Sequence, residues 1–384
     1  MSDGRPGTAE TQAVREVPLS RPWLDEREEK LVVEVLRSGR LSLGPWIDRF
    51  EEQVAERVDA PYAAAVSSGT AGLHLLCKIA GIGPGDEVIT SPLSFVASAN
   101  CFILEGATPV FADVDPVTLN MAAAAVEVAV TERTRAIVAV DMFGYPCELD
   151  ELRAIADRHG LTLIEDACES LGAEYKQRPL GAHGPAAVFA FYPNKQMATG
   201  EGGVVTTHGE EEWQLLRSLR NQGRSYEEEG GWFHHIRLGM NYRWTDVQAA
   251  IGLAQLEKLD RILELRAAAA ARYGELLVDV DGVEAPAPDD ADHRRSWFVY
   301  VVKLDRGVDR DAVMSALRRG GIATAEYVPC IHLQPYMRER YGFADGLCPV
   351  AEETASRTLA LPFFTQIEAD DQERVVEVLR AALA

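Results

Sequence analysis

Short apolar runs alternate with amphipathic segments from residue 63 to residue 207. Apolar runs bounded by glycine, proline or acidic residues predict strands, here over 88–90, 108–114, 136–141, 161–164, 188–192 and 204–207. Segments with an apolar face at helical spacing predict helices, here over 25–38, about 47–58, 96–104 and 148–159. This alternation is typical of an α/β layer with a mostly parallel sheet, which binds ligands at the carboxyl ends of its strands.

The pattern changes after residue 245. Thr245–Gln248 has the residues of a capping box, and the helix behind it is expected to run to about Leu277, long enough to bridge two domains. Beyond the prolines at 286 and 288, the pattern predicts a small α+β domain, with strands over 297–304 and 322–328 and helices over 310–319 and 370–383. We therefore expect a disordered lead at 1–16, a large domain at 17–255 and a small domain at 256–384.

Composition and charge narrow the classes of partner. The 384 residues are 47% hydrophobic and 26% charged, which is ordinary for a globular protein. A net charge of −22 argues against nucleic acid or an anionic membrane as the main partner. The six cysteines form no CxxC pair, so we expect free thiols and no metal site. No apolar run approaches a membrane span and the first residues lack a signal-peptide core, so the expected location is the cytoplasm.

The candidate chemistry lies in residues 161–205. Asp166 follows one predicted strand, Lys195 follows the next, and glycines stand at 200, 202 and 203. Pyridoxal phosphate (PLP) needs a lysine amine that forms a Schiff base with its aldehyde, and an acid that keeps its ring nitrogen protonated. A surface lysine and a helix-capping aspartate are the alternative interpretation. A strand that ends at an aspartate is followed by a strand that leads to a lysine and a glycine-rich turn. This order favours a PLP-binding site.

Two earlier segments could contribute to the same site. Ser68-Gly69-Thr70 lies between a predicted strand and an apolar helix, where free backbone N–H groups can bind a phosphate. Taken alone, this segment favours the alternative interpretation, simple N-capping of the helix by a hydroxyl. Phe95 follows the strand 88–90 and could stack on a flat ring, or it could be a core residue.

Five arginines concentrate within residues 217–243 of this acidic chain. They form either a pocket for phosphate or carboxylate, which guanidinium groups bind bidentately, or a solvated basic face. The five are Arg217, Arg220, Arg224, Arg237 and Arg243.

Six motifs, in order along the chain, resemble those of the DegT-type sugar aminotransferases. They are SSGTAGLHL, SFVASANC, ATPVFADVD, EDACESLGAEYKQRPLG, FAFYPNKQMATGEGG and RLGMNYRWTDVQAAIGLAQL. The resemblance runs from about Leu19 to the C-terminus and implies a fold-type I PLP enzyme with a seven-stranded large domain and a small C-terminal domain. It also implies a homodimer with active sites at the interface. Members of the family move an amino group, usually from L-glutamate, onto a keto group of a nucleotide-linked sugar.

The resemblance assigns roles to individual positions. Lys195 matches the Schiff-base lysine, Asp166 the partner of the ring nitrogen, and Phe95 the aromatic side chain against the ring. The phosphate turn matches Gly69 and Thr70, with Ser68 beside them. Asn241, in GMNYR, matches the residue that reaches the phosphate from the neighbouring subunit. Sister enzymes that act as dehydratases carry histidine in place of the lysine, so Lys195 favours transamination.

Two positions depart from the family pattern. Ala190 stands where a serine often contacts the phosphate, and Tyr192 or Asn194 could compensate. Glu169 stands where glutamine or histidine is common, and its carboxylate would change the charge near the cofactor.

The sequence therefore predicts transfer of an amino group from L-glutamate to a nucleotide-linked keto-deoxysugar, for surface polysaccharide or a secondary metabolite. Arg237, Arg243 and Tyr192 are candidate substrate contacts. The alternatives are the same chemistry on a cyclitol or another keto compound, and a PLP-binding regulator without turnover.

Overall fold

The structure is a computed structural model that describes residues 15–225 and 233–384. The predicted disordered lead lies, up to residue 14, outside the described residues. Val17 is already buried and pairs with Ile322.

A seven-stranded sheet forms the centre of the molecule, with the strand order β1-β9-β8-β5-β4-β2-β3. Every neighbouring pair is parallel except the two pairs that β9 makes, with β1 and with β8. This confirms the predicted mostly parallel sheet. Its strands are β1 (Tyr62–Val66), β2 (Glu87–Thr90), β3 (Thr108–Phe111), β4 (Thr134–Val140), β5 (Thr162–Asp166), β8 (Ala186–Ala190) and β9 (Gly203–Thr207).

Helices cover both faces of this sheet, because alternate residues of each strand are buried against opposite cores. In β8, Ala187 and Phe189 belong to one core, and Val188 belongs to the other. The first core holds residues of α1 (Glu26–Ser38), α2 (Pro45–Arg57), α5 (Ala123–Ala129), α6 (Leu149–His159) and α8 (Asp246–Glu257). The second holds residues of α3 (Gly69–Ile79), α4 (Ala97–Ile103), α7 (Glu210–Arg220), α11 (Pro335–Tyr341) and α12 (Pro349–Arg357).

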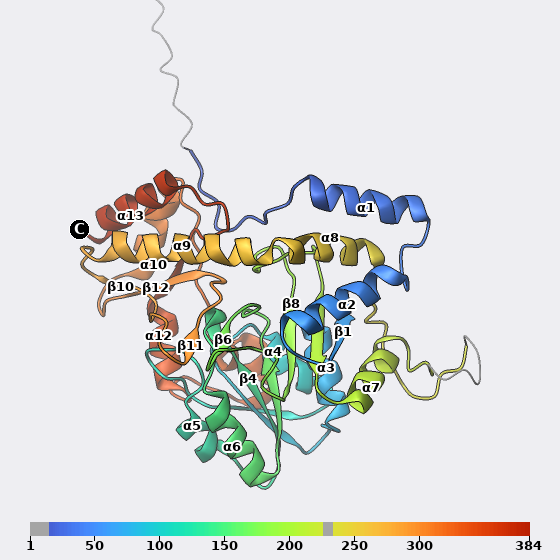
Figure 1. Ribbon diagram of the computed structural model, residues 1–384. Coiled ribbons are helices and arrows are strands. Elements are labelled where there is room, and N and C mark those ends of the chain that lie inside the picture. The colour runs from blue at the N-terminus through green and yellow to red at the C-terminus, as the bar shows by residue number, and fades with distance from the viewer. Residues whose placement is uncertain (1–14, 226–232) are drawn as a thin grey trace, which may run out of the picture.

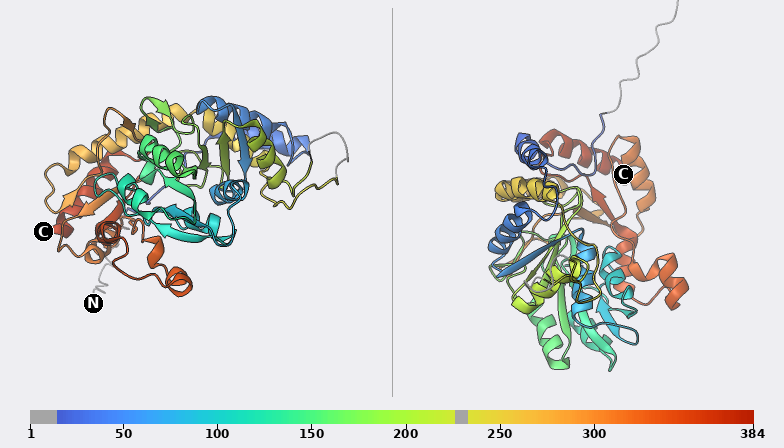
Figure 2. Two further views of the ribbon diagram at one scale, coloured as in Figure 1. Left: turned by 90° about the horizontal axis from the view of Figure 1, so that it is seen from below. Right: turned by 90° about the vertical axis from the view of Figure 1, so that its right-hand side faces the viewer.

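The C-terminal elements build a third core beside the large sheet (Figure 2). An antiparallel sheet of order β10-β12-β13 packs against helices there. The elements are β10 (Val283–Glu284), β12 (Tyr300–Leu304), β13 (Thr358–Leu361), α9 (Leu259–Leu277), α10 (Arg310–Arg319) and α13 (Ala369–Leu383). The expected boundary at 255/256 lies just before α9, and the division into two domains stays a prediction.

Two expectations for this half were wrong. The helix expected to run unbroken to Leu277 is interrupted at Lys258 (φ −116°, ψ 11°), and α8 and α9 continue end to end across the molecule (Figure 1). Lys258 turns its amine onto Asp25 and Glu28, at 2.8 and 2.7 Å. The segment 322–328 is not a strand: only single bridges at Ile322 and Ala325 form, and the chain then turns to the cavity described below.

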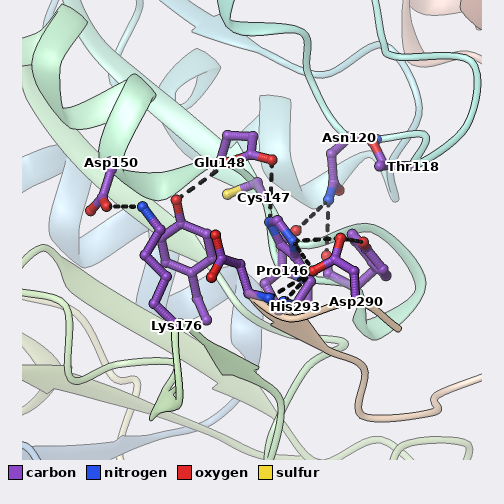
Figure 3. Close-up of polar contacts among 12 residues, drawn as sticks. Thr118, Asn120, Pro146, Cys147, Glu148, Asp150, Lys176, Asp290 and His293 are labelled. Carbon is purple, nitrogen blue, oxygen red and sulfur yellow. Dashed lines mark hydrogen bonds and ion pairs between the residues drawn. The ribbon is translucent and has the colours of Figure 1, made fainter. Parts of the chain in front are cut away.

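A third, small sheet joins the segment between β10 and β12 to the segment between β5 and β8. It consists of β6 (Glu174–Tyr175), β7 (Arg178–Pro179) and β11 (His293–Arg294). Figure 3 shows the polar contacts around it: His293 bonds to Asp290 at 2.9 Å and lies 3.3 Å from Glu148, and Lys176 pairs with Asp150 at 2.6 Å. These contacts fix the start of the segment that carries Phe298 to the cavity.

No helix in 15–225 or 233–384 is long and apolar enough to cross a bilayer. The same residues contain no group of three or more histidine, cysteine, aspartate or glutamate side chains that could hold a metal ion. All six cysteines are free thiols.

Candidate active site

A cavity of about 550 Å³ opens at the carboxyl ends of the central strands. Six segments that lie far apart in the sequence meet there: the turn before α3, the turn before α4, the end of β5, the loop from β8 to β9, the segment around 298 and the segment around 327. The residues predicted from the sequence that line it are Ser68, Gly69, Thr70, Phe95, Asp166, Glu169, Tyr192 and Lys195. This is the position at which parallel sheets bind ligands.

Asp166 is the last residue of β5, and only 5% of it is exposed. Its Oδ2 accepts a hydrogen bond from Ser98 Oγ at 2.6 Å, and its Oδ1 accepts one from the Cys168 N–H at 3.3 Å. Both carboxylate oxygens are therefore held, while the side chain still lines the cavity. The strand position predicted from the sequence explains why this acid, and not its neighbour Glu165, reaches the ligand side of the sheet.

Lys195 enters the same cavity from the loop after β8. Its Nζ lies 3.6 Å from Glu169 Oε1 and 3.9 Å from the centre of the Phe298 ring. The Lys195 and Glu169 side chains are each 13% exposed. An ammonium group over an aromatic face is stabilised by the ring's negative face. Lys195 thus has an acid and an aromatic ring around it, and it is not the surface lysine of the alternative interpretation.

Glu169 is a buried acid in direct reach of that lysine. Burial raises the pKa of the Glu169 carboxyl, and the charge of Lys195 opposes part of this rise. The backbone N–H of Phe143, a residue at φ 55°, donates to its Oε2 at 3.0 Å. The charge near the cofactor site therefore depends on whether Glu169 carries a proton.

The turn before α3 caps its helix and can also bind an anion. Ser68 is the N-cap, and its Oγ accepts from the Ala71 N–H at 3.1 Å. The first N–H groups of a helix have no partner within the helix, so those of Gly69 and Thr70 can serve an anion in the cavity. A Cβ at Gly69 would lie 2.6 Å from Cys168 Sγ, so only glycine lets the turn approach the end of β5.

Two glycines after Lys195 also allow a close approach, Gly203 to this turn and Gly202 to Trp244. A Cβ at Gly203 would lie 2.7 Å from the Ser68 carbonyl carbon, and one at Gly202 would lie 2.6 Å from the Trp244 indole nitrogen. The close approach expected here is therefore made to neighbouring protein atoms. Because Gly203 has no side chain, the start of β9 can pack directly against the backbone of the Ser68–Gly69 turn.

Two aromatic side chains are exposed at the cavity. Phe95 is 64% exposed and Tyr192 is 52% exposed, and both line it. A phenylalanine of the core would be buried, so the core interpretation of Phe95 is wrong. Its open ring face is available to a flat ligand.

The arginines lie elsewhere. Arg220 is buried and forms an ion pair with Glu51, which makes it a structural residue. Arg217, Arg224 and Arg237 border a separate hollow of about 450 Å³ on α7 and the segment after it. Arg243 donates to Asn221 Oδ1 at 3.0 Å. None of the five lines the cavity of Lys195 within one chain.

Asn241 also stays outside that cavity. It is exposed and pairs with Asn221 through an isolated bridge. A role for Asn241 at the phosphate therefore requires a second subunit.

Sequence reasoning missed the far side of the cavity. Phe298, Tyr327 and Val328 line it from the C-terminal half. Arg266, buried in α9, holds Phe298 by donating to its carbonyl at 2.5 Å and to that of Trp297 at 2.6 Å. No local motif marks these positions, because their use depends on how the two halves pack.

The expected cofactor fits these residues. A lysine amine, a held carboxylate, a helix N-terminus and an open aromatic face surround one cavity. Asn194 Oδ1 is buried at its wall without a hydrogen-bond partner among the described residues, so a bound group could supply one. The residues present therefore match the needs of PLP.

Comparison with known proteins gives the same assignment. The DegT/DnrJ/EryC1/StrS aminotransferase family matches residues 22–380. The chain is 40% identical over 375 residues to the spore coat polysaccharide biosynthesis protein SpsC of Bacillus subtilis, with 95% of this chain and 96% of SpsC covered.

Solved structures share the fold over nearly the whole chain. S. venezuelae DesV, solved in complex with a ketimine intermediate, has 34% identity and a TM-score of 0.89, with 95% of this chain and 98% of DesV covered. Spr1654 from Streptococcus pneumoniae, described as a sugar aminotransferase and solved in its PLP-form, has 25% identity and a TM-score of 0.91 over 96% and 98% of the two chains. The chain therefore belongs to the DegT/DnrJ/EryC1/StrS aminotransferase family, whose fold and PLP-dependent sugar aminotransferase activity it has.

Proposed function

We propose that this sugar aminotransferase moves an amino group from L-glutamate to a keto group of a nucleotide-linked deoxysugar, in amino-sugar biosynthesis. The observation that carries the proposal is the convergence of Lys195, Asp166 and the Gly69–Thr70 turn on one cavity. SpsC, a relative over nearly the whole length, is named for polysaccharide biosynthesis, which supports a sugar product of this class.

Each site residue then has a role. PLP, when bound, supplies an electron sink and a carrier for the amino group. Lys195 Nζ would hold the cofactor and, as a free amine, would take the proton from the Cα of the amino donor. Asp166 keeps the ring nitrogen protonated, and Phe95 covers one ring face. The N–H groups of Gly69 and Thr70 bind the phosphate.

The second subunit completes the site in this proposal. Asn241 is exposed and lies outside the cavity of its own chain, which suits a residue that reaches the phosphate of a partner. Arg237 and Arg243 are then candidates for the substrate diphosphate or the donor carboxylate across the same interface, since guanidinium groups bind both bidentately.

The test separates donor from acceptor. Purified protein with PLP is mixed with L-glutamate alone, and formation of 2-oxoglutarate is measured in a single turnover. The aminated protein is then offered nucleotide-linked keto-deoxysugars, the matching free keto sugars and a keto-cyclitol, and the products are identified by mass spectrometry. We expect amination of a nucleotide-linked sugar only. Amination of the cyclitol or free sugar with equal kcat/KM would contradict the proposed acceptor, and failure with glutamate would contradict the donor.

A further inference from the structure

The carboxylate of Asp166 is held by a hydroxyl in the wall of the cavity. Ser98 Oγ donates to Asp166 Oδ2 at 2.6 Å, and Ser98 is only 1% exposed. An O–H···O distance of about 2.5–2.7 Å is typical of a hydroxyl that donates to a charged carboxylate. This contact is much shorter than the 3.3 Å bond that Cys168 N–H makes to the other oxygen. Ser98 is therefore the principal donor to Asp166 among the described residues.

A second serine orients the first. Ser94 lies four residues before Ser98, in the turn that precedes α4, and the two hydroxyl oxygens are 2.6 Å apart in buried surroundings. A hydroxyl has one proton to donate. Because Ser98 gives its proton to Asp166, Ser94 must donate to Ser98. Both protons of the relay, defined as Ser94–Ser98–Asp166, thus point toward the carboxylate.

The relay also joins Asp166 to the aromatic side of the site. Ser94 precedes Phe95, and the Ser98 N–H bonds to the Phe95 carbonyl at 3.2 Å. The acid and the exposed ring are therefore held by the same turn before α4.

Most of the titratable groups around Asp166 are acids. Burial raises the pKa of four of them, and the charge of Asp166 contributes to each rise: Asp141 (to about 7), Glu169, Cys101 and Cys168. Glu165, its chain neighbour, is fully buried and burial raises its pKa as well. Lys195 is the cation that lines the same cavity.

We propose that Ser98, oriented by Ser94, is a positioning residue that holds the Asp166 carboxylate in place toward the ring nitrogen of the cofactor. The inference rests on the role proposed above for Asp166. Ser98 gives its only proton to Asp166 and is almost fully buried, so it acts on the cofactor through that carboxylate.

The experiment compares four variants of the full-length protein loaded with PLP labelled with ¹⁵N in its ring. The ¹⁵N chemical shift reports whether the ring nitrogen is protonated, independently of turnover. Ser98→Ala removes the donor, Ser98→Thr keeps a hydroxyl, and Asp166→Asn removes the charge. Ser91→Ala is the matched control, because Ser91 is 1% exposed and its Oγ donates to the Leu93 carbonyl at 2.9 Å without contact to Asp166.

The relay predicts a graded result. In Ser98→Ala, the pH at which the ring nitrogen loses its proton falls by about one unit or more, which corresponds to about tenfold or more in the equilibrium constant. Ser98→Thr lies nearer to wild type than Ser98→Ala does, and Ser91→Ala matches wild type. The rate of the glutamate half-reaction falls by about tenfold or more in Ser98→Ala at unchanged KM.

The outcomes separate the two claims. If Asp166→Asn shifts the ¹⁵N signal and Ser98→Ala behaves like Ser91→Ala, the relay is refuted and the role of Asp166 stands. If Asp166→Asn leaves the ring nitrogen protonated as in wild type, the proposed role of Asp166 itself is wrong.

Discussion

The close approach of Gly69 to the end of β5 makes a quantitative prediction. A Cβ at this position would lie 2.6 Å from Cys168 Sγ and 3.0 Å from the Ala190 Cβ, about 1 Å inside ordinary contact. Gly69→Ala must therefore move either the turn or residue 168. Overpacking of this kind costs about 1–3 kcal/mol. If the turn holds the cofactor phosphate and this cost falls on cofactor binding, the Kd for PLP rises by about 5- to 150-fold.

The assay is a titration of the apoprotein with PLP, followed by absorbance, together with thermal unfolding to show that the fold remains. Gly83→Ala is the control, because a Cβ there meets nothing within 4 Å. The double variant Gly69→Ala/Cys168→Ala removes the sulfur and should recover most of the lost affinity. An unchanged Kd in Gly69→Ala would refute the phosphate role of the turn. A loss that Cys168→Ala fails to relieve would show that the contact with sulfur is not its cause.

Three further predictions concern the assembly and the buried charges. Inactive Lys195→Ala and inactive Asn241→Ala should regain part of the activity when their subunits are exchanged, because one site per mixed dimer is intact; an active monomer in sedimentation would contradict this. Burial raises the pKa of Asp141 to about 7, well above the value of about 3.9 for an unfolded chain, so the folded state holds an extra proton between these values. The free energy of unfolding of the wild type should therefore fall relative to that of Asp141→Asn as the pH rises from about 4 to 7, and parallel curves in chemical denaturation would refute this. Arg220→Ala leaves Glu51 buried without its guanidinium partner and should lower the free energy of unfolding by about 3–5 kcal/mol, whereas a loss below about 1 kcal/mol in urea titration would contradict the structural role of the pair.

The central layer, and the placement of Asp166 and Lys195 at one cavity, could be predicted from local patterns. Strand ends are encoded by short apolar runs that stop at polar residues, so the sequence alone places Asp166 and Lys195 at one edge of a parallel sheet. The exposed position of Phe95 could not be read locally, because the same residue after the same strand could also enter the core.

Contacts between distant segments could not be predicted in this way. The centre of the Phe298 ring lies 3.9 Å from Lys195 Nζ only because Arg266 and the segment 289–296 hold Phe298 in this position. The ion pair of Arg220 joins residues that are 169 positions apart. The sequence alone therefore could not distinguish Arg220 from the four other arginines within residues 217–243. The predicted strand at 322–328 failed for a related reason, since this apolar segment faces the cavity instead of completing a sheet.

The central claim is that Lys195 is the residue that holds PLP. Reduction of the holoenzyme with borohydride fixes a lysine-bound cofactor permanently, and peptide mass spectrometry then locates it. We expect one phosphopyridoxyl group per chain on the peptide that contains Lys195, and none in Lys195→Ala. Attachment to another lysine, or an unmodified Lys195 in a protein that remains catalytically active, would contradict the account.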